Sequence, residues 1–291
     1  MKYPIPHDLR RHQVAIDLVG AGGTGSRLLT ALAELHIALN STGHPGLRVF
    51  AWDPDRVSEA NVGRTAFAPS DLGQLKSAVM ISRINMVFGL DWRAFGEAYR
   101  YPSPWTVERA GEPPGLVITC VDTLGARANL HRQMLVGELP PPRLWLDCGN
   151  GEESGQVILG EPEWMGNPDA YRRRPRLPTV VDVFPGMLES AETEEPDAPS
   201  CTLAMALGMQ GLSVNRLMAD YAQNLLWRLF RDGGLDVHGY YVNAKTGRTN
   251  PIPVGGAPKP VAPAVALPEA PERQTRRLRA AGRRVGRFAC R

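Results

Sequence analysis

The feature that most constrains this chain is a glycine-rich turn, GAGGTG, at residues 20–25. An apolar run of strand composition, QVAIDLVG (Gln13–Gly20), leads into the turn, and leucines at helical spacing follow it. Glycines at a strand-to-helix turn let the backbone approach a phosphate, and the helix N-terminus supplies oriented N–H groups. The spacing alone is a weak signal, because a tight turn without a ligand also needs glycine. In this strand–turn–helix context we expect nucleotide binding.

Strand-like and helix-like segments alternate along the first part of the chain. A helix at Thr24–Leu39 is followed by a strand at Leu47–Asp53, and this crossover indicates parallel strands. Further expected strands lie at 93–101, 115–122, 143–150 and 155–161, and further expected helices lie at 75–89 and 127–138. The pattern predicts an α/β fold, a Rossmann-like and mainly parallel sheet flanked by helices, with a C-terminal β-hairpin at 240–254.

The length of 291 residues suits one α/β domain with appendages. We place this domain at 1–254, including an irregular, mobile crossover segment at about 162–199, after which the pattern becomes helical. From residue 255 the chain is rich first in proline and alanine and then in arginine. Such a composition buries little apolar surface, so we expect residues 255–291 to form a disordered basic tail.

Several classes of protein are disfavoured by composition. The chain has no apolar run of about 18 residues, so we expect no membrane span. Its N-terminal stretch, MKYPIPHDLRRHQ, lacks the apolar centre of a secretory signal. The cysteines are far apart and form no C-x-x-C pair, so we expect neither a structural zinc site nor a disulfide framework, and we expect a cytoplasmic location; they are Cys120, Cys148, Cys201 and Cys290.

The segment Asp53–Ala78 favours ATP over NAD as the bound nucleotide. Asp53 lies where an acceptor for ribose hydroxyls belongs, but both nucleotides contain ribose. The same segment also brings Arg64 and Lys76 close to carboxylates, as an enzyme that neutralises a triphosphate requires. An NAD-dependent oxidoreductase has no need of this cluster. Any one of these charges alone is typical of a solvated surface. For Asp55, capping of a turn and contact with a metal ion are equally good interpretations.

The ordered motifs resemble those of the ThiF/MoeB/ubiquitin-activating (E1-like) superfamily of ATP-dependent adenylyltransferases. The matching stretches are GAGGTG (20–25), DPDRVSEANVGR (53–64), GQLK (73–76) and TCVDTLGAR (119–127). The stretches at 199–222 and 239–254 are similar to those of ThiF-like proteins from plasmid-borne PRTRC cassettes. The two C-x-x-C pairs that hold zinc in ThiF and MoeB are missing here, so no zinc site is carried over.

The resemblance implies an activity and a set of roles. A carboxylate, usually at the C-terminus of a small ubiquitin-like or sulfur-carrier protein, attacks the α-phosphate of ATP and yields an acyl-adenylate and pyrophosphate. Asp122 would orient Mg²⁺ or the α-phosphate, and it could also be the N-cap of the helix that follows it, since the two roles are compatible. Gly20, Gly22, Gly23 and Gly25 would form the nucleotide loop, and Asp53 would bind the ribose. The phosphates would be contacted by Asn61, Arg64 and Lys76.

Cys201 has two readings that the sequence leaves open. It lies in PSCT, which looks like the P-x-C-T of ubiquitin-activating enzymes, whose cysteine receives the carrier as a thioester. A position at a helix start lowers the pKa of a thiol, which favours a nucleophile. Free cysteine also commonly packs as a small apolar residue. The lack of a separate carrier-recognition domain indicates a minimal enzyme, which we expect to be a homodimer.

The net charge of +3 is unevenly distributed, because residues 255–291 carry nine basic and two acidic residues. The basic tail has three readings: a solvated extension, an arm with weak, sequence-independent affinity for nucleic acid, or a docking peptide. Two functional alternatives to the adenylyltransferase remain. A nucleotide-binding scaffold would bind ATP without releasing pyrophosphate, and an NAD-dependent oxidoreductase would tolerate the loss of Arg64 and Lys76.

Overall fold

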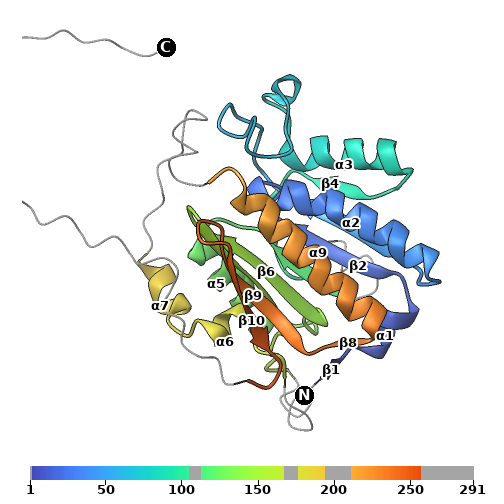
Figure 1. Cartoon of the computed structure of the whole chain (residues 1–291), viewed down its shortest axis with the longest axis vertical. Helices are drawn as coiled ribbons and strands as arrows, with labels where there is room; N and C mark the ends of the chain where they lie inside the picture. Colours follow the sequence, from blue (N-terminus) through green and yellow to red (C-terminus); the bar gives the residue numbers. More distant parts are fainter. Residues whose placement is uncertain (1, 105–112, 167–175, 194–210, 257–291) are drawn as a thin grey trace, which may run out of the picture. The chain divides into compact units, whose positions relative to one another are not determined.

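The computed structural model describes residues 2–104, 113–166, 176–193 and 211–256, all within the compact unit Met1–Pro260. Its centre is an eight-stranded β-sheet (Figure 1). The strands of this sheet are, in chain order, β2 (Val14–Val19), β3 (Leu47–Trp52), β4 (Arg93–Phe95), β5 (Leu116–Thr119), β6 (Leu144–Asn150), β7 (Ser154–Gly160), β9 (Val237–Asn243) and β10 (Arg248–Pro253).

The sheet is mainly parallel, with an antiparallel extension on one side. Its strand order is β10-β9-β7-β6-β5-β2-β3-β4. The strands from β6 to β4 run parallel to one another, whereas β7, β9 and β10 are added antiparallel. The order reverses beside β2, and this places the glycine turn where ligands bind in open α/β sheets. The predicted Rossmann-like fold and its C-terminal hairpin are confirmed.

Helices cover both faces of the sheet (Figure 1). One face packs against α2 (Gly23–Ser41), α3 (Lys76–Phe88) and α9 (Val214–Asp232). The other face packs against α5 (Leu124–Val136), α6 (Val180–Val183) and α7 (Met187–Glu192). Alternate residues of β5 point to opposite sides, since Leu116 and Ile118 belong to the first cluster and Val117 to the second. The continuous apolar composition of these strands follows from burial on both faces.

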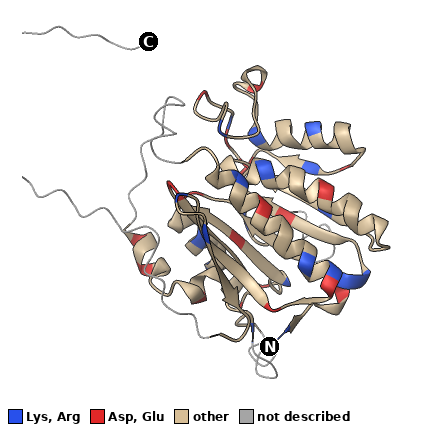
Figure 2. Ribbon diagram, viewed as in Figure 1, with Lys and Arg blue, Asp and Glu red and all other residues tan. Residues whose placement is uncertain are grey.

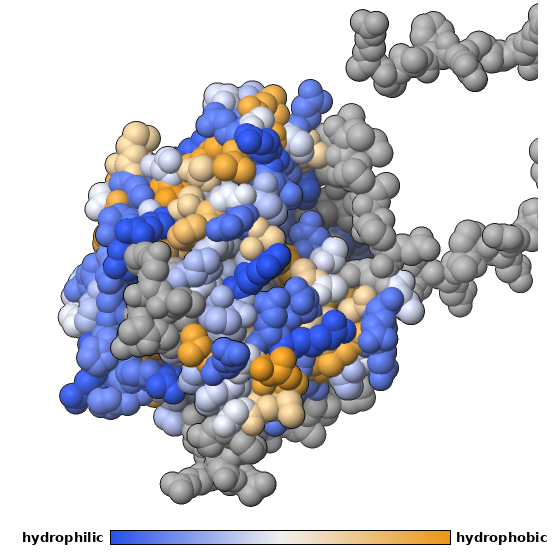
Figure 3. Space-filling view, turned by 180° about the vertical axis from the view of Figure 1, so that it is seen from behind, coloured by the Kyte–Doolittle hydropathy of each residue, from blue (hydrophilic) through white to orange (hydrophobic). Residues whose placement is uncertain are grey.

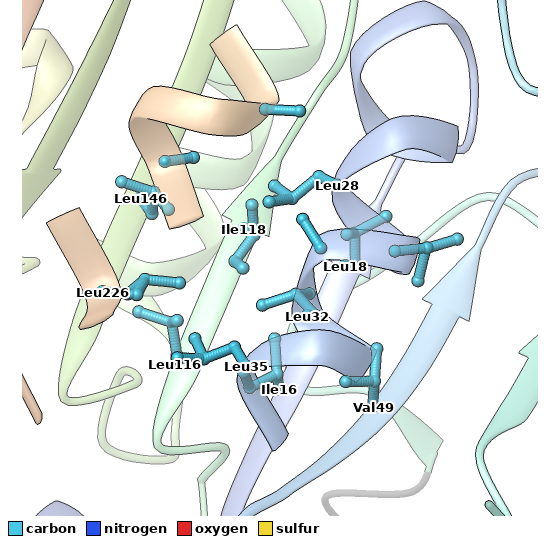
Figure 4. Packing of buried hydrophobic residues seen from close by; sticks show 14 of the residues in the cluster. Ile16, Leu18, Leu28, Leu32, Leu35, Val49, Leu116, Ile118, Leu146 and Leu226 are labelled. Atoms are coloured by element: carbon cyan, nitrogen blue, oxygen red, sulfur yellow. The ribbon is translucent and has the colours of Figure 1, made fainter. Parts of the chain in front are cut away.

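The main core lies between the sheet, α2 and α9. Figure 4 shows Leu28, Leu32 and Leu35 of α2 among side chains from the strands, with Leu226 of α9 beside them. Leu28, Leu32 and Leu226 are fully buried. The apolar face of α9 therefore packs on α2 and the sheet, as the sequence favours for an amphipathic helix.

The described part of the crossover segment, 176–193, differs from the irregular structure that we expected. It contains α6 and α7, and it buries Val180, Val181 and Met187 against the second face of the sheet. Arg176 fixes it through a bidentate ion pair with Asp182, at 2.8 and 2.7 Å. Helices of four and six residues carry too little periodicity to be recognised from the sequence.

The N-terminal residues form small elements that the sequence did not indicate. They are β1 (Tyr3–Pro4) and α1 (His7–Arg11), and β1 pairs antiparallel with β8 (Gly234–Leu235). Within the described residues no helix combines the length and the apolar character that a membrane span needs. Figure 3 shows the side of the molecule opposite to that of Figure 1, where apolar residues form small groups among hydrophilic ones.

Candidate functional site

The glycine turn connects the carboxyl end of β2 to the first turn of α2. Gly20 has a positive φ of 90°, and its N–H donates to the carbonyl of Trp52 at 2.9 Å. A Cβ on Gly25 would lie 1.8 Å from the carbonyl oxygen of Gly20, so α2 begins in direct contact with the strand. A Cβ on Gly22, by contrast, would meet no described atom within 4 Å. Gly22 therefore leaves open space at the N-terminus of the helix, where a phosphate would bind.

Asp53 connects this turn to the segment after β3. It is 4% exposed, and its carboxylate accepts the N–H of Ala21 at 2.6 Å and the N–H of Asp55 at 2.8 Å. Burial raises the pKa of Asp53, while these hydrogen bonds and the Lys76 charge act in the opposite direction. A ribose hydroxyl would share these carboxylate oxygens with the backbone amides. The residue thus supports the turn as well as offering an acceptor.

Lys76 begins α3 and forms an ion pair with Asp55. The distance from Nζ to the Asp55 carboxylate is 2.8 Å, and the Lys76 N–H donates to the Asp55 carbonyl at 3.0 Å. The Lys76 side chain is 11% exposed and that of Asp55 is 66% exposed. A buried stem thus holds the ammonium group against an exposed carboxylate. An entering phosphate could replace the Asp55 carboxylate as the ion-pair partner of Lys76. The released carboxylate would then be hydrated by solvent.

Asn61 and Arg64 lie on the turn between β3 and α3, where charges of both signs occur (Figure 2). The Asn61 side-chain oxygen accepts two hydrogen bonds from Ser58, one from the backbone N–H at 3.0 Å and one from the hydroxyl at 3.2 Å. Asn61 therefore stabilises the turn. Arg64 is half-buried, and its Nε donates to the Ala60 carbonyl at 2.9 Å. Burial lowers the pKa of Arg64, and the Asp122 carboxylate opposes this shift. Arg64 is therefore within electrostatic range of Asp122.

Asp122 lies in the loop between β5 and α5, and it is exposed. The N-cap of α5 is Thr123, whose hydroxyl accepts the N–H of Ala126 at 3.2 Å. The alternative reading of Asp122 as the cap is therefore wrong, because the helix begins one residue later than that reading requires. The Asp122 carboxylate remains available at the carboxyl edge of the sheet.

Sequence reasoning missed two buried polar residues at this edge. Arg127 is 4% exposed and pairs with Asp147 of β6 at 2.9 Å. It is the last residue of the stretch TCVDTLGAR, and this position was the available signal. Asn215, at the start of α9, accepts the Thr24 hydroxyl at 3.2 Å and the Asn150 amide at 2.6 Å. Nothing in the local sequence pattern indicates the partners of Asn215, which come from α2 and β6.

Neither of the two cysteines that the structure describes is exposed. Cys120 and Cys148 are 7% and 1% exposed and belong to the core. Cys201 lies outside the described residues. No three His, Cys, Asp or Glu side chains of the described ranges gather in a metal-binding group. Mg²⁺ commonly uses only one or two carboxylates together with waters and substrate phosphates, so Asp122 alone fits such an ion.

Comparisons with known proteins agree with this architecture. The model of the ThiF family matches residues 7–228, which is most of the chain. No curated protein sequence matches the chain.

Among solved structures, E. coli MccB with succinimide matches with a TM-score of 0.51 and 12% identity, over 84% of this chain and 65% of that chain. E. coli MccB with MccA matches with a TM-score of 0.50 and 12% identity, over 87% of this chain and 66% of that chain. This chain thus spans slightly less than two thirds of the length of MccB, and at this identity the likeness shows a common fold. Because the family model covers most of its length, the chain belongs to the ThiF family.

Proposed function

We propose that this chain is an ATP- and Mg²⁺-dependent adenylyltransferase. Its substrate would be the C-terminal carboxylate of a small ubiquitin-like or sulfur-carrier protein. The observation that carries the proposal is the grouping at one sheet edge of an open glycine turn, a strand-end acid and two cationic side chains. Membership of the ThiF family supports the same activity.

The residues of this edge suit the parts of ATP. The N-terminus of α2 offers backbone N–H groups and a partial positive charge, and Gly22 leaves the space that a phosphate needs. Asp53 would accept hydrogen bonds from the ribose hydroxyls. Lys76 and Arg64 would neutralise the phosphates, with Asn61 holding the turn that carries Arg64.

Asp122 is the proposed Mg²⁺ contact. When bound, the ion would supply charge neutralisation at the phosphate oxygens. The exposed carboxylate of Asp122, with Arg64 in electrostatic range, suits a site that must hold opposite charges side by side. The substrate phosphates and waters would supply the other ligands.

In the proposed reaction a substrate carboxylate oxygen attacks the α-phosphorus of ATP. A P–O bond forms to the substrate, the bond to the β-phosphate oxygen breaks, and pyrophosphate leaves. The protein would contribute positioning and charge stabilisation. Solved structures of the similar MccB include one with MccA, which supports a peptide or a small protein as the second substrate of this chain. A homodimer, a thioester at Cys201 and a cytoplasmic location are further parts of this proposal.

Ligand-dependent thermal unfolding tests the nucleotide assignment. The comparison is between ATP·Mg²⁺ and NAD, on the wild type and on Lys76→Ala, Arg64→Ala and Asp53→Asn. A ligand at about 100 times its Kd stabilises the folded state by about 2.7 kcal/mol. We expect ATP·Mg²⁺ to stabilise the wild type and to stabilise each variant less, because each loses a charge-assisted contact of about 1.5–3 kcal/mol. Arg132→Ala is the control, since Arg132 is an exposed cation on α5.

Two outcomes would contradict this assignment. Stabilisation by NAD alone would favour the oxidoreductase, and equal stabilisation of all the variants would refute the roles of Lys76 and Arg64. Pyrophosphate release in the presence of candidate carriers then tests the chemistry. ATP binding with no pyrophosphate release for any carrier would favour the scaffold.

A further inference from the structure

We propose that Arg127 is a positioning residue, which fixes the loop that presents Asp122 at the nucleotide site. The inference rests on the proposed function, because that function gives the Asp122 carboxylate its role. Neither Arg127 nor its anchor, Asp147, has been placed in the ligand contacts above.

Arg127 holds the backbone on both sides of Asp122. Its Nη2 donates to the carbonyl of Val121 at 2.7 Å, and its Nη1 donates to the carbonyl of Thr123 at 3.2 Å. These are the residues immediately before and after Asp122. One planar guanidinium group therefore fixes the two carbonyls that flank an exposed carboxylate.

The anchor of Arg127 is part of the central sheet. Its Nε donates to Oδ1 of Asp147 at 2.9 Å, and the two side chains are 5% and 1% exposed. The same oxygen accepts the hydroxyl of Thr119 at 2.6 Å, and that hydroxyl accepts the indole N–H of Trp145 at 2.9 Å. Thr119 and Asp147 are register partners on the parallel strands β5 and β6. The loop is thus connected by short, water-excluded hydrogen bonds to the most buried strands.

Stability alone does not account for this arrangement. A buried ion pair contributes little net stability compared with well-packed apolar residues, because both ions lose their hydration. Oδ2 of Asp147 is buried and has no hydrogen-bond partner among the described atoms, which adds to that cost. What the pair provides is a fixed geometry in the loop that carries Asp122. Lysine at 127 would keep the charge but could not hold both carbonyls with one rigid group.

Hydrogen–deuterium exchange of the protein without nucleotide tests the geometry directly. The Ala126 amide, which donates to Thr123, reports on the order of the loop. We expect Arg127→Lys and the milder Asp147→Asn to speed exchange at residues 121–126 relative to the wild type. Arg132→Lys, the same substitution at an exposed position of α5, is the control and should leave this exchange unchanged. Unchanged exchange in a folded Arg127→Lys or Asp147→Asn protein would overturn the proposal.

A double-mutant cycle tests the connection to Asp122. The readout is the factor by which Mg²⁺ strengthens ATP binding in the wild type, Arg127→Lys, Asp122→Asn and the double variant. Residues that support a metal ligand typically contribute about 10–100-fold to metal affinity, so we expect each single variant to reduce this factor by about tenfold or more. The double variant should lose no more than Asp122→Asn, because Arg127 acts through Asp122.

The outcomes separate this inference from the proposed function. Losses that multiply in the double variant would show that Arg127 acts independently of Asp122 and would overturn the proposal. If the wild type binds no ATP, the proposed function fails, whereas the exchange experiment still decides whether Arg127 orders the loop. If Arg127→Lys does not fold, Asp147→Asn and the pair Asp147→Asn/Asp122→Asn replace it in both experiments.

Discussion

Among single residues, two glycines of the turn have opposite surroundings. Gly25 faces the carbonyl oxygen of Gly20, which a Cβ would approach to 1.8 Å. Gly22 faces no described atom within 4 Å. Gly25 is therefore required for the packing of the helix on the strand. Gly22 is not required by that packing, and it leaves room for a ligand at the helix N-terminus.

This contrast predicts a separation of folding from binding. Gly25→Ala should lower the free energy of unfolding by about 1–3 kcal/mol or more, because the backbone must move away from the added methyl group. Gly22→Ala should lower the free energy of unfolding by less than Gly25→Ala does. Its larger effect should be on the free energy of ATP binding. Denaturant unfolding and ATP titration of both variants measure the two effects. Equal stability losses in the two variants would contradict the argument.

The sequence pointed to those candidate site residues whose positions depend on local spacing. The glycine turn, Asp53 and Lys76 could be found because a motif and a strand end mark them. Arg127 and Asn215 were not identified, because their partners are 20 and 191 residues away and depend on the strand order. The sequence also left Asp55 open between a cap and a metal ligand, and the structure gives it an ion pair with Lys76.

Among the elements, the 3-10 helix η1 (Pro69–Asp71) connects the turn that carries Arg64 to α3. Asp71 accepts the N–H of Ala68 at 2.7 Å, and both of its carboxylate oxygens accept from Nη2 of Arg83 in α3, at 3.0 and 2.9 Å. Burial opposes ionisation of Asp71, but the Ala68 amide and the Arg83 guanidinium hold its pKa below the usual value. One carboxylate thus fixes the position of the whole segment against α3.

Asp71→Asn should destabilise the protein in a pH-dependent manner. The folded pKa of Asp71 lies below the unfolded value of about 3.9, so its contribution is present above that pH and is lost as the pH falls toward the folded pKa. At pH 7 we expect a loss of about 1–2 kcal/mol, reduced by solvent around the partly exposed Arg83. The difference from the wild type should shrink below about pH 4, as urea unfolding across this range would measure.

The matched control for this prediction is Asp91→Asn. Asp91 pairs with Arg48 at 3.8 Å and its side chain is 86% exposed, so its loss should change little at any pH. A constant difference between Asp71→Asn and the wild type from pH 7 to pH 3 would contradict the proposed ion-pair contribution.

The long elements could be predicted from periodicity, whereas the short ones could not. The helices at 23–41, 76–88 and 214–232 each present a repeated apolar face, and the central strands are mostly apolar. β4 was expected to extend to residue 101 but has only three residues, since the parallel ladder with β3 ends at Phe95. β1 and β8 have two residues each and exist only because they pair with each other.

In the whole molecule, stability depends on the packing of α2 and α9 against the sheet. Leu226→Ala should lower the free energy of unfolding by about 2–5 kcal/mol, because Leu226 is fully buried in the main core. Leu212→Ala, close before α9, is the control, since Leu212 is 63% exposed. Chemical denaturation followed by circular dichroism measures both. A similar, small change in the two variants would show that α9 packs more loosely than described.

The contact between Asn215 and the glycine turn also has a consequence for biosynthesis. Asn215 bonds to Thr24 across 191 residues, and its side chain occupies the position beside Gly23. A ribosome completes the turn at residues 20–25 early, but the neighbour that packs on it is made only when translation has passed residue 215. Until then the nascent chain has the nucleotide motif without its support. Nucleotide affinity should therefore emerge late in synthesis, and fragments that end before α9 should bind poorly even though they contain every residue of the motif.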